Sequence, residues 1–269
     1  DDTEMMIGVA ESLVENEGFN GKDMAKKFIK NFNVFRGYGP SPPEVLEWIE
    51  KGEPWDKASE KLFGGAGSYG NGGAMRVAPI GLFYHDDPKK LKLVAYQATQ
   101  ITHAHPLGKE GAALQAYAIS LTITLTKPLN KEVFLQNLND FVESKIYKEK
   151  IRLVKDLLNK KAKPQEVVFK LGNGIEAFNS VPTAIYSFLA NLESFEESVV
   201  YAVNLGGDTD TLGAMTGGLS GSYHGIEKIP QRWKEKLENR VYIESLAEKL
   251  WEIKLKVSSK NKYILETLK

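Results

Sequence analysis

Four residues with side-chain oxygens follow a glycine pair in the C-terminal third, in the order Gly206-Gly207-Asp208-Thr209-Asp210-Thr211. Asp and Thr are favoured at helix starts, because their oxygens accept hydrogen bonds from free backbone N–H groups there. One helix needs one such cap, so four oxygen-bearing side chains exceed that need. A second acidic cluster, Asp1-Asp2-Thr3, opens the chain. If the two clusters meet, their carboxylates would form the oxygen-only environment that Mg²⁺ prefers.

The composition excludes several other kinds of site. The chain contains no cysteine, which excludes a thiol nucleophile, a disulfide, a Cys-based zinc site and an iron–sulfur cluster. It contains only four histidines, of which His103 and His105 are paired in sequence. Structural zinc needs four nitrogen or sulfur ligands, so a zinc site is not expected here. Such a pair is more often a structural or surface feature, and its functional alternative is a histidine at a helix end that contacts a phosphate or a ribose. Any metal ion must then be held mainly by oxygen.

A glycine-rich segment between Gly64 and Gly73 holds six glycines in ten residues. Glycine lets the backbone turn its N–H groups toward an anion and approach it closely. Within this segment Ser68 and Asn71 add side-chain donors, and Tyr69 offers a face on which a base or a ribose can stack. The pattern is neither a Walker loop nor a dinucleotide-binding fingerprint. A plain flexible loop is the alternative.

Helical periodicity dominates the segments that must position these residues. Amphipathic or apolar helical patterns cover residues 24–32, 91–98, 112–123, 133–146, 151–158, 181–192, 198–204 and 246–255. The best strand candidate is short, at residues 166–169. These patterns predict an all-α fold.

Glycine, proline and lysine mark the rest of the chain. We predict loops at residues 37–43, where adjacent prolines cannot continue a helix, and at residues 172–174. The Lys-rich stretch 145–163 is typical of a solvated helical face. After Thr211, small residues recur every four positions, which would let another backbone approach one face of a helix closely. These are Gly213, Gly217 and Gly221, and beside them Ala214, Gly218 and Ser222.

Size and charge limit the class of protein. The chain has 269 residues, a mass of 30.0 kDa and equal numbers of basic and acidic side chains, 35 of each. A zero net charge gives no support for nucleic-acid or membrane-surface binding. No apolar stretch approaches the length of a membrane span, and neither a signal peptide nor an internal repeat is visible. We expect a single domain over residues 1–269, in a cytoplasmic monomer. Because the chain opens without Met, we also expect a segment ahead of Asp1 in the complete protein.

Taken together, the motifs resemble those of the ADP-ribosylglycohydrolase family, and most closely its ADP-ribosylhydrolase 3 branch. They occur in the family's order from Asp1 to about Gly225. The motifs are the opening Asp-Asp-Thr-x-Met, the segment Gly67-Ser-Tyr-Gly-Asn-Gly-Gly-Ala-Met-Arg76, Thr102-His103, Leu171-Gly-Asn-Gly-Ile175, Ser180-Val-Pro-Thr-Ala-Ile-Tyr186 and Leu205-Gly-Gly-Asp-Thr-Asp-Thr211.

The resemblance implies a compact all-α fold with two Mg²⁺ ions in a cleft, for which Mn²⁺ can substitute. The metal ligands it implies are Asp1, Asp2, Asp208, Asp210 and Thr211. The loop that it assigns to the diphosphate and distal ribose of ADP-ribose consists of Ala66, Gly67, Ser68, Tyr69, Gly70, Asn71 and Gly72. Asp1 and His103 would also contact the ligand, and Ile175 would line its adenosine side.

The implied activity is hydrolysis of the ribosyl C1″ bond in ADP-ribosylated protein, O-acetyl-ADP-ribose or poly-ADP-ribose. In this family the acid/base is a glutamate in an upstream helix, and a Ser, Thr or Gly precedes the first Asp; both positions lie outside the printed sequence. Within it, Asp2 and Asp208 are the fallback catalytic carboxylates. The alternatives are a non-catalytic ADP-ribose-binding module and a crystallin-like structural protein, and a structural role would not need the carboxylates of Asp208 and Asp210.

Overall fold

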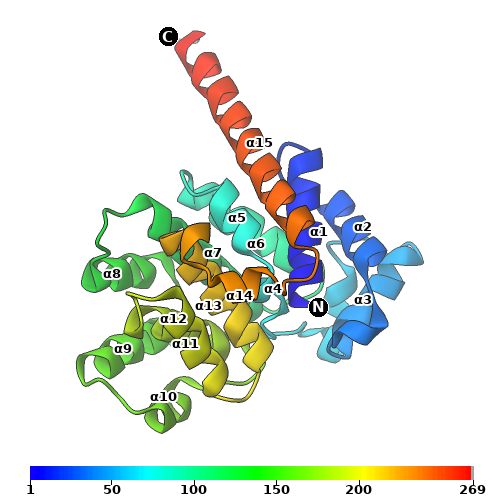
Figure 1. The fold of residues 1–269 in the computed structure, drawn as a ribbon. Coiled ribbons are helices and arrows are strands. Elements are labelled where there is room, and N and C mark those ends of the chain that lie inside the picture. Colours follow the sequence, from blue (N-terminus) through cyan, green and yellow to red (C-terminus); the bar gives the residue numbers. More distant parts are fainter. Residues whose placement is uncertain (268–269) are drawn as a thin grey trace.

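The computed structural model describes the backbone of residues 1–267 and the side chains of residues 1–260. Throughout this part of the chain the regular elements are helices, and an isolated bridge between Gly70 and Glu176 is the one β-type pairing described. The predicted all-α fold is confirmed (Figure 1).

The elements follow one another with short connections. The first half contains α1 (Asp2–Glu15), α2 (Gly21–Asn31), η1 (Val34–Arg36), α3 (Ser41–Glu50), η2 (Ala58–Gly65), α4 (Gly72–Met75), α5 (Ala78–Phe83), α6 (Pro88–Gln100) and α7 (Pro106–Thr124). The second half contains α8 (Lys131–Phe141), α9 (Lys145–Asn159), α10 (Pro164–Leu171), α11 (Ala177–Ala190), α12 (Phe195–Asn204), α13 (Thr209–His224), η3 (Ile226–Lys228), α14 (Gln231–Lys234) and α15 (Arg240–Thr267).

Three helices, α7, α11 and α13, form the centre of the molecule and pack against one another. Helix α7 is buried around most of its circumference, and its chain is rich in Ala, Leu and Ile. A helix that is apolar on all sides belongs inside a protein. Around these three pack α4 and α5 from the first half of the chain and α9 and α12 from the second, so both halves share one core.

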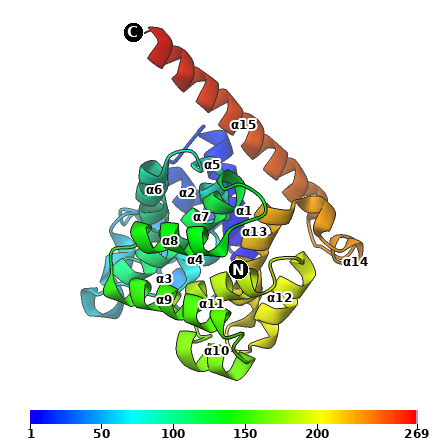
Figure 2. The same cartoon turned by 90° about the vertical axis from the view of Figure 1, so that its left-hand side faces the viewer.

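The long helix α15 lies across α1 and α5 and then runs past the body of the molecule (Figures 1 and 2). Among the described residues, its buried side chains are Leu246, Leu250 and Lys254, and Lys254 pairs with Asp86. Within the described part of the chain, no helix is both long and apolar enough to cross a bilayer.

The strand candidate at residues 166–169 is wrong, because these residues lie inside α10. Val167 and Leu171 are buried one helical turn apart, whereas Phe169 is 82% exposed. The hydrophobic pattern was therefore helical, and two adjacent β-branched residues gave the false strand signal.

The helical segment 133–146 is not continuous, since α8 ends at Phe141 and α9 begins at Lys145. Glu110 of α7 explains the break. Its Oε1 accepts the N–H groups of Glu143 at 2.6 Å and Ser144 at 2.9 Å, and these N–H groups are then not part of a helix. Ser144 in turn accepts the N–H of Tyr147 and caps α9. A contact from a distant helix overrides the local periodicity here.

The predicted loop 37–43 is too long at its C-terminal end. Helix α3 begins at Ser41, and Pro42 and Pro43 lie in its first turn. N–H groups in a first turn have no partner within the helix, so proline costs nothing there. The prolines start a helix instead of preventing one.

The small residues of α13 do allow close packing. A Cβ on Gly213 would lie 3.1 Å from Val203 Cγ2 of α12, and a Cβ on Gly221 would lie 3.7 Å from the Phe195 ring. Helix α12 therefore lies against the face formed by Gly213, Gly217 and Gly221.

Candidate functional site

The glycine-rich loop, residues 66–72, is held between the starts of α7 and α11. Ser68 O accepts the N–H of His105 at 3.3 Å, and Tyr69 O accepts the N–H of Ala177 at 3.0 Å. Asn71 N–H donates to Ile175 O at 2.8 Å, so the loop pairs with the residues just before α11. These bonds make the segment a fixed structure, which argues against the alternative of a flexible connector.

Two glycines of this loop are required by close approach. Gly67 has a φ of +71°, and a Cβ there would lie 2.7 Å from the backbone nitrogen of His105. A Cβ on Gly72 would lie 2.4 Å from Cε1 of His103. A larger residue would displace one of these neighbours.

Asp208 lies at the N-cap position of α13, but its side chain accepts no capping hydrogen bond. Its Oδ2 instead accepts from Asn71 Nδ2 at 2.7 Å. Ser180 Oγ lies 3.1 Å from the same amide nitrogen and supports Asn71 from α11. The interpretation of Asp208 as a plain helix cap is therefore wrong, because its carboxylate is turned toward the glycine-rich loop.

The turn before α13 is fixed by the Leu171-Gly-Asn-Gly-Ile175 segment. Asn173 O accepts the N–H of Asp208 at 2.8 Å, and Asn173 Nδ2 donates to Leu205 O at 3.0 Å. Gly207 has a φ of +74°, and a Cβ there would lie 2.2 Å from Asn173 O. Two motifs that are about thirty residues apart are thus joined directly beside the carboxylates.

The two acidic clusters meet. Asp1 and Asp2 at the start of α1 and Asp210 in the first turn of α13 each place a carboxylate oxygen within 4.8 Å of the others. Asp2 is only 8% exposed, and its buried Oδ1 has no hydrogen-bond partner among the described residues. Thr211 is also buried beside this group, whereas Asp210 is exposed.

Proximity changes the acidity of these carboxyls. Burial, followed by the charge of Asp210, raises the pKa of Asp2. Burial also raises the pKa of Asp208, and the neighbouring Asp210 adds to this, against a lowering by the hydrogen bond from Asn71. Both pKa shifts have the same two causes: burial removes part of the water around the carboxyls, and negative charges lie close together.

This donor set fits a hard divalent cation. It offers only oxygens, its charges repel one another when no cation lies between them, and one of its buried oxygens has no partner in the described part of the chain. Asp1, Asp2, Asp208, Asp210 and Thr211 are all in or next to the cluster.

His103 lies directly behind the loop and is 5% exposed. Its Nδ1 is 2.7 Å from Thr102 Oγ1, and Arg76 Nη2 donates to that oxygen at 2.8 Å. Burial, with a further contribution from the Arg76 charge, lowers the pKa of His103 to about 3. The imidazole is therefore neutral at physiological pH.

The remaining predicted residues form the outer part of the site. Tyr69 is 47% exposed and packs edge-on against His105, and Ile175 is 66% exposed. Phe63, which the sequence analysis did not single out, is 67% exposed and has a φ of +51° just ahead of the glycines. An aromatic residue held in the left-handed region beside Gly64 is a feature that only the structure reveals.

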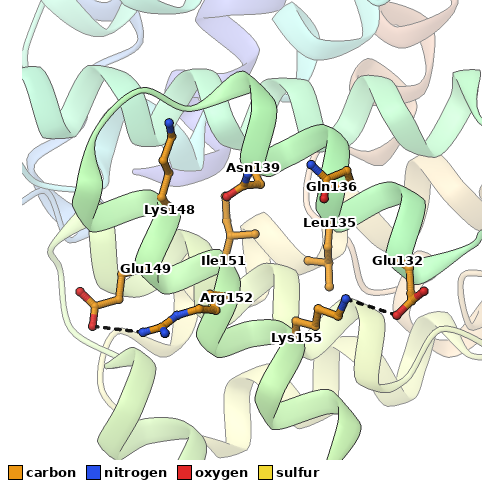
Figure 3. A pocket seen from close by; sticks show the side chains of 9 residues that line it. All are labelled: Glu132, Leu135, Gln136, Asn139, Lys148, Glu149, Ile151, Arg152 and Lys155. Carbon is orange, nitrogen blue, oxygen red and sulfur yellow. Dashed lines mark ion pairs between the residues drawn. The ribbon is translucent and has the colours of Figure 1, made fainter.

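Two cavities can be compared with this site. One, of about 270 Å³, borders Asp2 and is lined by apolar and small residues, including Met75, Ile119 and Gly218. The other is a groove of about 580 Å³ between α8 and α9. Figure 3 shows that charged side chains flank it and that Arg152 and Lys155 are paired with Glu149 and Glu132. It contains none of the predicted site residues.

Comparison with known proteins identifies the family of the chain. The family model for ADP-ribosylglycohydrolase matches residues 1–259. The chain belongs to the ADP-ribosylglycohydrolase family. It is 35% identical to chicken (Gallus gallus) ADP-ribosylhydrolase ARH3, over 94% of this chain and 77% of that protein. It is also 35% identical to the human protein of the same name, over 93% and 77%.

The fold likeness extends to a solved structure. A chain described as an ADP-ribosylglycohydrolase-related protein complex matches with a TM-score of 0.74 and 27% identity, covering 94% of this chain and 81% of that one. Family and relatives together show that this ADP-ribosylglycohydrolase is an enzyme of the glycosidase class.

Proposed function

We propose that this ADP-ribosylglycohydrolase cleaves the ribosyl C1″ bond of ADP-ribose conjugates in a Mg²⁺-dependent reaction. Its substrates would be ADP-ribosylated protein, O-acetyl-ADP-ribose or poly-ADP-ribose, and free ADP-ribose would be released. The observation that carries the proposal is the convergence of Asp1, Asp2 and Asp210 within 4.8 Å, beside a loop that is built to approach an anion.

The metal ligands we propose are the carboxylates of Asp1, Asp2, Asp208 and Asp210 with the hydroxyl of Thr211, holding two Mg²⁺ ions or Mn²⁺ in their place. When bound, such ions orient a ribose diol and lower the pKa of a water.

The glycine-rich loop would bind the diphosphate. Among the described residues, the backbone N–H groups of Ser68 and Tyr69 donate to no other group. Gly70 N–H is already used by Ser68 Oγ at 3.1 Å, which fixes the turn that presents the two free donors. Free N–H groups on a rigid turn bind anions without reorganisation.

Asn71 would link the loop to the carboxylates. Its hydrogen bond to Asp208 fixes the distance between the segment that binds diphosphate and the one that faces the ribose. Holding reactants in one geometry is worth several kcal/mol of the barrier.

Proton transfer needs a carboxyl near the scissile bond, as in other glycosidases. Within the printed sequence the fallback carboxyls that we propose for this role are Asp2 and Asp208, because Asp2 lies in the carboxylate cluster and Asp208 lies beside the glycine-rich loop. From the family resemblance, we propose a glutamate ahead of Asp1 as the principal acid/base.

The test is Asp208→Asn, with Asp156→Asn on the exposed side of α9 as the matched control. Release of ADP-ribose from an ADP-ribosylated peptide is measured on protein expressed with any residues that precede Asp1. We expect Asp208→Asn to lose about 100-fold or more, because the side chain keeps its shape and loses the charge that would hold a cation. Its Mg²⁺-induced rise in melting temperature should also shrink. Turnover equal to that of the control would refute the proposal.

A further inference from the structure

Within the part of the chain that the structure describes, the His103 ring makes a hydrogen bond through one of its nitrogens, Nδ1. Thr102 Oγ1 is 2.7 Å from His103 Nδ1 and 2.8 Å from Arg76 Nη2. Arg76 is 1% exposed, lies 4.4 Å from the centre of the Phe28 ring, and also donates to Ala98 O at 3.1 Å. Its hydrogen-bond partners are neutral, and no carboxylate pairs with it among the described residues.

The hydrogens along this chain can be assigned by donor capacity. A guanidinium can only donate, so Thr102 Oγ1 accepts from Arg76. The threonine hydroxyl then has one hydrogen to give, and His103 Nδ1 is the one acceptor bonded to Oγ1 among the described residues. Nδ1 therefore carries no proton. Because the ring is neutral, its proton is on Nε2.

His103 Nε2 faces the glycine-rich loop. A Cβ on Gly70 would lie 3.2 Å from Nε2, and a Cβ on Gly72 would lie 2.8 Å from it. The described residues provide no hydrogen-bond partner for this nitrogen. An N–H group is thus directed at the loop, and no acceptor for it is found among the described residues.

We propose that Arg76 and Thr102 are positioning residues that fix His103 as its Nε2–H tautomer, so that the loop side of the site presents a neutral donor to a ligand oxygen. The identity of that oxygen, a ribose hydroxyl or a diphosphate oxygen of ADP-ribose, rests on the proposed function. The assignment of the proton does not.

This positioning role also accounts for the burial of Arg76, which is unfavourable for stability. A buried guanidinium without a carboxylate partner pays a desolvation penalty, and a buried apolar residue would serve stability better. Arg76 nevertheless occupies the interior, where its N–H group takes one lone pair of Thr102 Oγ1, so that the hydroxyl hydrogen points away from Arg76 and toward His103 Nδ1. Outer partners that orient metal-ligating histidines typically change affinity or activity by 10- to 100-fold when removed, and we expect an effect of this kind for His103.

The primary experiment is nitrogen NMR of the intact protein labelled at histidine, without ligand. His103 is assigned by the loss of its signals in His103→Gln. We expect a proton on Nε2 and a hydrogen-bonded, unprotonated Nδ1, unchanged from about pH 8 to about pH 5.5. A proton on Nδ1 would overturn the proposal.

The paired variants are Thr102→Val and Thr102→Ser. Valine keeps the shape and removes the hydroxyl, while Arg76 keeps its bond to Ala98 O. We expect Thr102→Val to shift the Nδ1 resonance and to weaken ADP-ribose binding about tenfold by calorimetry. Serine should restore both. If Thr102→Val leaves the Nδ1 resonance as in the wild type, the positioning role is wrong.

The NMR and binding measurements distinguish a failure of the positioning role from a failure of the proposed function. The NMR arm needs no ligand, so wild-type protein that shows the expected tautomer but does not bind ADP-ribose supports the positioning of His103 and contradicts the proposed function. If Thr102→Val does not fold, the wild-type and Thr102→Ser spectra still decide the tautomer.

Discussion

Asp208 has the residue type and position of a helix cap, yet its carboxylate accepts from Asn71 and not from the backbone of its own helix. The surplus of oxygens at residues 208–211 was the signal that something beyond capping occurs there. Types and spacing could therefore identify the carboxylates and the loop. Arg76, Thr102 and Ser180 lie in the quoted motifs, but types and spacing could not assign their roles, because those depend on contacts between Asn71 and Ser180 and between Arg76 and Thr102.

Gly72 provides a test of the loop at the scale of one residue. We expect Gly72→Val to abolish ADP-ribose binding, because a Cβ would lie 2.4 Å from His103 Cε1 and would displace the ring or the loop. The measurement is isothermal calorimetry, with circular dichroism to confirm the helical fold. Gly39→Ala is the control, since a Cβ there meets nothing within 4 Å. Wild-type affinity in a folded Gly72→Val protein would show that the loop is only a connector.

His103 predicts a pH dependence of stability. Its pKa is about 3 in the folded protein and near 6.5 in the unfolded chain, so between these values the unfolded state binds the extra proton. The stabilisation is present above about pH 6.5 and is lost as the pH falls, by about 2 kcal/mol between pH 7 and pH 5.

The measurement is urea unfolding of wild type and His103→Gln at these two pH values. The wild type should lose more stability than the variant by this amount, because glutamine does not titrate. Equal losses in the two proteins would contradict the neutral, buried assignment of His103.

At the scale of elements, helix existence was predictable and several boundaries were not. Residues 166–169 and 133–146 were misassigned because each boundary depends on burial against another helix or on a side chain from one. The prolines at the start of α3 were misjudged for a local reason, since a first turn tolerates them. Hydrophobic periodicity indicates which face of a helix is buried. It does not indicate where a side chain from a distant helix sets a helix boundary.

Glu110 tests the boundary between α8 and α9. We expect Glu110→Ala to lower the free energy of unfolding by about 1–3 kcal/mol, because the N–H groups of Glu143 and Ser144 lose their acceptor. Glu110→Gln, which retains a carbonyl oxygen, should lose less. Glu149→Ala on the exposed face of α9 is the control and should stay within about 0.5 kcal/mol of wild type. Urea unfolding distinguishes these outcomes, and an unchanged Glu110→Ala would remove Glu110 as the cause of the break.

At the scale of the whole molecule, the fold brings four distant segments to one place. The start of α1, the loop 66–72, residues 171–175 and the start of α13 meet through Asn71, Asn173 and the carboxylates. From the sequence, a metal site was expected only if the two acidic clusters meet. No sequence pattern could show that they do, because the contacts join segments from most of the length of the chain. The central helices α7, α11 and α13 supply the rigid frame that makes it possible.

We propose that this ADP-ribosylglycohydrolase hydrolyses ADP-ribose conjugates at a carboxylate cluster that needs a divalent cation. The most direct measurement follows ADP-ribose release from an ADP-ribosylated peptide by chromatography, on protein expressed with any residues that precede Asp1, first with EDTA and then with Mg²⁺ restored. We predict negligible release in EDTA and full recovery with millimolar Mg²⁺, because the residues that crowd their charges at Asp2 and Asp210 would then hold the cation. Equal release in EDTA and in Mg²⁺ would contradict the account.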